Sequence, residues 1–134
     1  MNPARRTAKG GAGDARNRRL IAAKYLEVAE LAATEEGAAA NNVVVGVAVL
    51  AGIAASDAIC LAATGSRYAG DSHDEAAKVL AGVDRKLGDE LSKLVRLKSG
   101  AHYGSKFIGN EDRTRALRAA ATLVDAATER TLGA

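Results

Sequence analysis

The sequence predicts an all-α fold, and three observations support this prediction. Apolar residues recur at steps of three and four over most of the chain, which is the spacing of amphipathic helices. Pro3 is the only proline, so no later position is barred from a helix by a missing backbone N–H. Hydrophobic residues make up 48% of the 134 residues and aromatic residues only 3%, so the core must be built from small and branched aliphatic side chains.

The front of the chain is basic and has no apolar periodicity. Residues 1–24 hold seven basic residues and one acidic residue, whereas the remainder holds 12 basic and 15 acidic. We expect residues 1–13 to be a disordered basic arm and residues 14–134 to be one helical domain. The arm either meets phosphates or only solubilises the protein. It lacks the apolar core of a signal peptide, and the lone Cys60 fits a reducing compartment, so we expect a cytoplasmic protein.

Asp14 is a suitable cap for a first helix that runs to about Glu36, with Ile21, Tyr25, Val28 and Ala32 on its core face. A second helix follows within residues 38–65, starting at an N-cap of Asn41 or Asn42 and ended by Gly65. Residues 37–56 carry no charge, so a membrane span must be considered. Much of this segment is Ala and Gly, however, and we expect a buried helix without a membrane.

Asp71 or Ser72 caps a third helix of about 25 residues, whose core stripe is the clearest in the chain: Ala76, Leu80, Val83, Leu87, Leu91 and Leu94, widened by Val79 and Val95. Asn110 caps a last helix with a stripe of Leu117, Ala120, Leu123 or Val124, and Ala127. Four amphipathic helices with short links predict a four-helix up-and-down bundle.

Standard catalytic and metal-binding motifs are missing. The sequence has no CxxC, HExxH, P-loop or GxSxG motif, and one Cys with two His does not favour a zinc site. We therefore expect neither a metal nor a cofactor.

The candidate site is the segment "RLKSGAHYG", which holds Arg96, Lys98, Ser99, His102 and Tyr103. In a continuous helix Arg96 and His102 differ by about 120° and ~9 Å, whereas Lys98 and His102 share a face. Arg96 and His102 could converge through a local bend, or a symmetric partner chain could bring a second pair opposite the first. A plain helix C-terminus with dipole-complementing charges is the alternative.

If Arg96 and His102 converge on a phosphate, metal-independent RNA cleavage follows. Neutral His102 would take the proton from a ribose 2′-OH, and Arg96 would hold the phosphate and its growing charge. Asp57 is a further candidate for the substrate site, because a carboxylate in an apolar helix needs a partner, for which we expect Arg96 or Lys98. His73 is expected to be a surface or capping residue, and Tyr68 and Tyr103 either stack on a base or close the bundle end.

The span Leu91–Ala127 resembles the C-terminal half of HEPN domains, which are all-helical nucleotide-binding modules. Their signature is an Arg followed four to six residues later by a His at the end of the third helix, and Arg96 and His102 match it. The resemblance extends over roughly Asp14–Leu132 through "RRLIAAKYLEVAELAAT" and "VLAGIAASDAICLAA".

The resemblance implies an RNA- or nucleotide-directed protein, possible metal-independent endoribonuclease activity, and a toxin–antitoxin or defence setting. It also implies a homodimer with facing motifs and a nucleotidyltransferase-like antitoxin partner. Leu97 stands where active members usually have a polar residue, which favours a second hypothesis: a non-catalytic module that binds a partner protein or nucleotide. A third hypothesis is a structural or adaptor bundle in which residues 1–24 do the binding.

Overall fold

A computed structural model describes the backbone of residues 6–103 and 106–132, and the side chains of these residues except 99–103. The described residues form helices α1 (Ala12–Ala32), α2 (Ala38–Thr64), α3 (His73–Val83), α4 (Arg85–Tyr103) and α5 (Asn110–Thr131), with strands β1 (Thr7–Lys9) and β2 (Ser66–Tyr68). The predicted all-α class is therefore confirmed at the level of a mostly helical fold.

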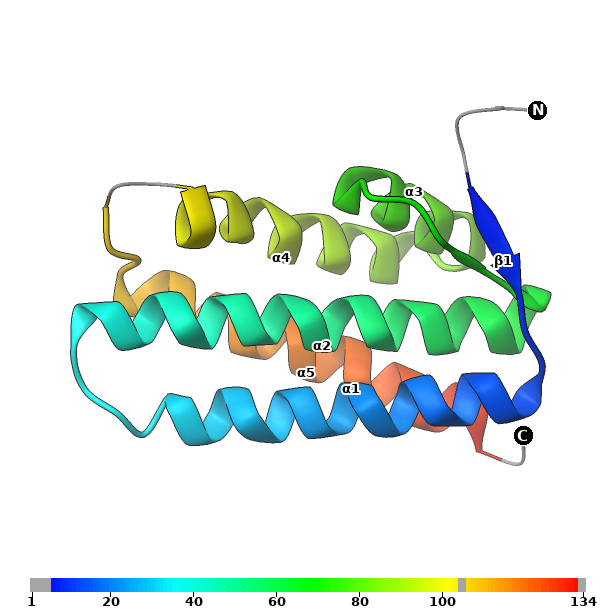
Figure 1. The fold of residues 1–134 in the computed structure, drawn as a ribbon, viewed down its shortest axis with the longest axis horizontal. Coiled ribbons are helices and arrows are strands. Elements are labelled where there is room, and N and C mark those ends of the chain that lie inside the picture. Colours follow the sequence, from blue (N-terminus) through cyan, green and yellow to red (C-terminus); the bar gives the residue numbers. More distant parts are fainter. Residues whose placement is uncertain (1–5, 104–105, 133–134) are drawn as a thin grey trace.

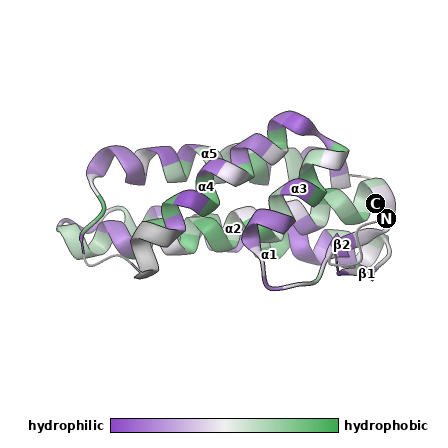
Figure 2. Cartoon of the chain, turned by 90° about the horizontal axis from the view of Figure 1, so that it is seen from above, coloured by the Kyte–Doolittle hydropathy of each residue, from purple (hydrophilic) through white to green (hydrophobic). Residues whose placement is uncertain are grey.

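The four long helices α1, α2, α4 and α5 run along the molecule in alternating directions (Figure 1). Helix α2 is central and packs against α1, α4 and α5, while the short α3 lies beside one end of α4. Helix α2 is long and apolar enough to cross a membrane, but 78% of its most apolar window is buried inside the bundle. Figure 2 colours much of α2 as hydrophobic, whereas α4 and α5 carry many hydrophilic residues. The prediction that this helix is buried is confirmed.

Helix α1 packs with a different face from the one we expected. Its buried residues are Ala15, Ala22 and Ala29, whereas Ile21 and Val28 of the predicted core face are 40% and 43% exposed. Methyl side chains seven residues apart form a flat strip that lets α1 approach α2 closely, and larger side chains on that face would hold the helices apart. Leu20, Ile21, Val28 and Leu31 consequently point outward, whereas Tyr25 of the predicted face and Leu26 are partly buried and pack against the core.

The helix ends also differ from expectation. Helix α1 begins at Ala12 with Gly11 as its N-cap, and the Asp14 carboxylate accepts the backbone N–H of Gly11 at 2.9 Å from inside the first turn. It ends at Ala32, and α2 begins directly after Gly37, whose φ of 116° needs a glycine. Gly65 ends α2 in the left-handed conformation, as predicted.

Asn41 and Asn42 lie within α2 and hold the segment before α5 instead of capping α2. The Asn41 side-chain amide donates to Ile108 O at 2.8 Å and to Asn110 Oδ1 at 3.0 Å, and Arg113 donates to Asn41 Oδ1. Asn42 Oδ1 accepts the backbone N–H of Ile108 at 2.9 Å. These bonds tie the start of α5 to the start of α2.

The predicted third helix is broken at Asp84 into α3 and α4. Asp84 is extended, its carboxylate accepts the N–H of Leu87 at 3.2 Å, and it also pairs with Arg130 of α5. These partners, the Leu87 N–H first, lower the pKa of Asp84. A Cβ on Gly88 would lie 2.6 Å from Ala81 Cα, so this glycine allows α3 to fold against the first turn of α4. The leucine stripe continues across the break, so the apolar periodicity of the sequence gives no sign of the break.

Thr7–Lys9, which we expected to lie in a disordered arm, form β1 and pair with β2 in antiparallel register, Ala8 opposite Arg67. The backbone N–H groups of Gly10 and Ala69 extend the ladder to Gly65 O and Arg6 O. The pairing holds the start of the chain against the end of α2 (Figure 1). The described part of the arm, residues 6–13, is thus strand and helix start.

Candidate functional site

A buried ion pair joins α1 to the middle of α2. Asp57 is 7% exposed, and its Oδ2 lies 2.9 Å from an Arg18 terminal nitrogen and accepts the Arg18 Nε–H at 3.2 Å. Our expectation that Arg96 or Lys98 is the partner of Asp57 is wrong. Arg18 is the residue that α1 brings to Asp57, because it lies one turn beyond the buried Ala15 on the same face.

Burial governs the ionisation of Asp57. Loss of water raises the pKa of its carboxyl above the ordinary value, while the charges of Arg18 and Arg67 and the Arg18 hydrogen bond act in the opposite direction. Arg18 is the direct partner of the carboxylate, while Arg67 donates to the carbonyl oxygen of Tyr68 and acts on Asp57 only through its charge.

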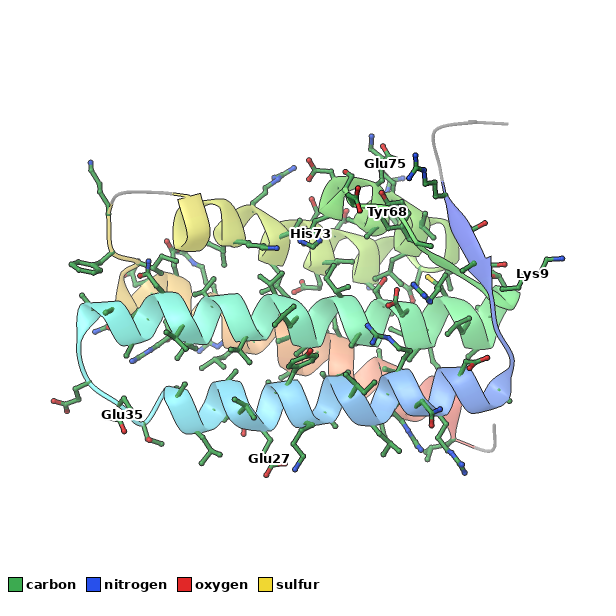
Figure 3. All side chains as sticks on the ribbon, viewed as in Figure 1. Lys9, Glu27, Glu35, Tyr68, His73 and Glu75 are labelled. Carbon is green, nitrogen blue, oxygen red and sulfur yellow. The ribbon has the colours of Figure 1, made fainter. Side chains whose placement is uncertain are left out.

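A hollow of about 240 Å³ opens beside this pair. Its lining comes from α1, α2, β2, the loop after β2, and α3: Arg18, Ile53, Asp57, Arg67, Tyr68, Ala69, Gly70, His73 and Ala76. We call this hollow the polar pocket. Tyr68 and His73 lie on the same side of the bundle, near α3 (Figure 3). Elements far apart in the sequence therefore place two arginines, a histidine and a carboxylate around one small cavity.

The loop that closes the polar pocket is fixed by Tyr68. Its hydroxyl accepts the backbone N–H of Ser72 at 2.9 Å, and its ring packs against the core. A Cβ on Gly70 would lie 2.3 Å from this hydroxyl, so the loop passes close to the ring only because residue 70 is glycine. Tyr68 thus closes the bundle end, the structural one of the two roles predicted for it.

Lys98 of α4 reaches the polar pocket through His73. Lys98 Nζ lies 2.6 Å from Nε2 of His73, the first residue of α3. The ammonium can only donate, so His73 Nε2 accepts and the proton of a neutral imidazole is on Nδ1. Ser72 is the N-cap of α3, as expected, and half-buried His73 is a pocket residue and not the surface or capping residue we predicted.

The remaining residues of the predicted site lie further along α4. Arg96 is exposed. The side chains of Ser99, His102 and Tyr103 lie outside the described part of the structure. The backbone of α4 is helical from Arg85 through Gly100 to Tyr103, so a bend that would bring Arg96 to His102 is not present. Helical geometry leaves these two positions about 9 Å apart along the axis, and places His102 one turn beyond Lys98.

A larger hollow of about 540 Å³ lies between α4 and α5, lined by Glu90, Lys93, Leu94, Leu97, Arg115, Arg118, Ala119 and Thr122. Lys93 pairs with Glu90, and Arg115 pairs with Asp112, each three residues away on its own helix. These are exposed pairs of the kind that any helix surface carries. Leu97 is half-buried and packs against the core, so packing explains why residue 97 is apolar.

Among the residues of the polar pocket, the sequence pointed to Asp57, Tyr68 and His73 but missed Arg18 and Arg67; it also pointed to Lys98, which contacts His73. Arg18 could have been found from the alanines seven residues apart that mark the true inner face of α1. Arg67 had no comparable signal, because its position depends on the pairing of β1 with β2.

No protein-family model, curated protein or solved structure matches this chain. The resemblance to HEPN domains therefore stands on the motif and helix order alone.

Proposed function

We propose that this protein binds a phosphate group of RNA or of a nucleotide in the polar pocket, as a HEPN-like cytoplasmic protein of a toxin–antitoxin or defence system. The observation that carries the proposal is that Arg18 and Arg67 line a cavity in which Asp57 is the one carboxylate, while Lys98 contacts the lining residue His73. Two guanidinium groups against one buried carboxylate leave an excess of positive charge in a confined space, which favours a phosphate.

The size of the polar pocket suits a phosphate and not a whole nucleotide. A volume of about 240 Å³ is below the usual range of about 300–1,000 Å³ for sites that enclose a small molecule. The base and sugar would therefore lie outside the cavity. A single phosphate within an RNA strand fits this geometry as well as a terminal phosphate does.

Titration calorimetry with AMP and with inorganic phosphate tests this proposal. Arg67→Ala removes a guanidinium that lines the polar pocket, and a lost charge-assisted hydrogen bond of about 1.5–3 kcal/mol predicts at least tenfold weaker binding. Arg115→Ala removes the same charge from the exposed surface of α5 and is the matched control. Equal weakening by both variants, or no binding by the wild type of either ligand or of a short RNA, contradicts the proposal.

Metal-independent RNA cleavage by Arg96 and His102 is the second candidate function. The unbroken helix α4 supports it, because it carries His102 one turn beyond Lys98, the residue that joins α4 to the polar pocket. A strand held there by its phosphate would run toward His102. In this proposal His102 takes the proton of the 2′-OH, the 2′-oxygen attacks the phosphorus, and the 5′-oxygen leaves and takes a proton from water. Arg96 of a second chain stabilises the charge on the phosphate.

Incubation of end-labelled RNA in EDTA tests the second candidate, with wild type beside His102→Ala. Cleavage by the wild type alone, leaving 2′,3′-cyclic phosphate ends, supports it. If both proteins are folded, bind phosphate and leave the RNA intact, the protein is a binding module that engages RNA, a nucleotide or a nucleotidyltransferase-like partner. Loss of all RNA affinity when the exposed Arg6, Lys9 and Arg16 are replaced by Ala, with phosphate binding unchanged, would instead favour the adaptor hypothesis in which the basic residues of 1–24 do the binding.

A further inference from the structure

The outward side of α1 carries large apolar side chains that the described part of the chain leaves exposed. Leu20 is 56% and Leu31 is 63% exposed, and Ile21 and Val28 beside them are 40% and 43% exposed. Glu27 from the same side points away from the bundle (Figure 3). Single exposed apolar residues are ordinary on protein surfaces, but these four lie on one side of one helix, in one pair on either side of the charged Lys24 and Glu27.

Leu20 and Leu31 belong to a row of residues with the spacing of a coiled-coil seam, and Ile21 and Val28 flank this row. Steps of three, four, three, four and three residues connect its members: Asn17, Leu20, Lys24, Glu27, Leu31 and Thr34. Such steps keep the same side of a helix turned toward a partner helix. We call these six residues the α1 seam; Thr34 follows the end of the helix directly and donates to Leu31 O.

The α1 seam is symmetric about the point between Tyr25 and Leu26. If two copies of α1 pack antiparallel about a two-fold axis at this point, each member of the seam faces the member at the same distance on the other side of the axis. Leu20 then faces the partner's Leu31, Lys24 faces the partner's Glu27, and Asn17 faces the partner's Thr34. Apolar residues meet apolar residues, and each cation meets an anion.

The charges beside the α1 seam follow the same two-fold pattern. Residues 15–24 contain only basic charges, and residues 25–36 contain only acidic charges. An antiparallel pair places the basic half of one helix against the acidic half of the other, whereas a parallel pair sets like charges together. Charge complementarity of this kind fits a second copy of the same helix.

We propose that the α1 seam is a docking surface for a second copy of this chain and forms an antiparallel homodimer. An interface about a two-fold axis must be complementary to itself. The α1 seam meets this condition because its facing pairs are Leu with Leu and Lys with Glu. Lys24 already binds Glu27 of its own chain at 2.9 Å, so in the dimer each Lys24 lies between two carboxylates. The leucines supply the buried area and the central charges set direction and register.

This interface is independent of the phosphate-binding proposal. Helix α1 lies on the opposite side of α2 from α4 (Figure 1), so the α1 seam faces away from Arg96 and Lys98. It is also a different face from that of a dimer with facing motifs on α4. Failure of one proposal therefore leaves the other intact.

Sedimentation equilibrium at micromolar concentrations tests the dimer with charge-swapped variants. Lys24→Glu alone and Glu27→Lys alone each set like charges opposite each other, and we expect each to weaken association at least tenfold. The double variant Lys24→Glu/Glu27→Lys restores opposite charges and should recover most of the wild-type association. Phe107→Ser is the control, because it removes a side chain that is 69% exposed on another part of the molecule. A monomeric wild type, or a double variant no better than the singles, overturns the proposal.

Cysteine cross-linking tests the register. Cys60 is buried, so new surface cysteines are the ones that react. Leu20→Cys mixed with Leu31→Cys should give only the mixed disulfide dimer, because position 20 of one chain faces position 31 of the other. Two copies of position 20 would be about 16 Å apart in the antiparallel pair, too far for a disulfide. Cross-linking of Leu20→Cys with itself would indicate a parallel pair and contradict the proposal.

Discussion

The Arg18 guanidinium lies 2.9 Å from a carboxylate oxygen of Asp57, and this ion pair joins two helices at positions 39 residues apart. The carboxylate side chain is 10% exposed and the guanidinium 31% exposed, so the anion is the more deeply buried partner. Removing water from a carboxylate costs free energy that an ion pair recovers only in part. Asp57 therefore weakens the fold relative to a neutral residue of the same shape.

Asp57→Asn is expected to change how stability depends on pH. Because burial raises the pKa of Asp57 in the folded state, this carboxyl stabilises the fold most below pH 3.8, and the contribution is lost as pH rises through the raised pKa. The free energy of unfolding of Asp57→Asn minus that of wild type should therefore increase with pH above that point. Urea unfolding of both proteins at several pH values measures it. A difference that falls with rising pH would show that Arg18 and Arg67 outweigh burial.

Gly88→Ala is expected to destabilise the protein by about 1–3 kcal/mol, because the new methyl group would lie 2.5 Å from Ala81 Cβ and 2.6 Å from its Cα. Gly82→Ala is the matched control, since a Cβ there meets nothing within 4 Å, and a helical Ala should add about 0.5–1 kcal/mol. Thermal or urea unfolding of the two variants distinguishes them. Equal effects would mean that α3 does not pack closely on α4.

Cys60 is expected to be inert toward thiol reagents in the folded protein. It is 2% exposed, and burial, assisted by the nearby charge of Asp57, raises the pKa of its thiol to about 11. At pH 8 almost all of it is protonated, and the thiol is a poor nucleophile. A chromogenic disulfide reagent should label it only as fast as the protein unfolds, and immediately in guanidinium chloride. Rapid stoichiometric labelling of the folded protein would place Cys60 at an accessible site.

The sequence predicted a helix correctly where one physical requirement decides the outcome, such as the burial of an uncharged segment or a left-handed residue at a helix end. The uncharged run around Val43–Ser56 had to be buried, and Gly65 had to end it, since a left-handed residue there is favoured only for glycine. The break at Asp84 was missed because the leucine stripe passes through it. The inner face of α1 was missed because alanines, which carry little hydrophobic signal, allow the closest helix contact, while larger apolar residues such as Ile21 and Val28 are exposed.

The candidate site was also predicted only in part. Asp57 was identified because a charge in an apolar helix needs a partner. Its partner Arg18 was not identified, because the face with which α1 packs against α2 was predicted wrongly. The bond between Lys98 and His73 depends on the fold-back of α3 on α4. Side-chain chemistry was readable from the sequence, and the pairing of side chains across elements was not.

The most direct test of phosphate binding in the polar pocket compares Asp57→Asn with Asp125→Asn. Each variant removes one negative charge, but Asp57 lines the polar pocket and Asp125 is exposed on α5. Calorimetric titration with AMP should show tighter binding for Asp57→Asn than for wild type, and wild-type binding for Asp125→Asn. Equal affinities for the two variants, or a weaker affinity for Asp57→Asn with its fold intact, would contradict the assignment of the polar pocket as a phosphate site.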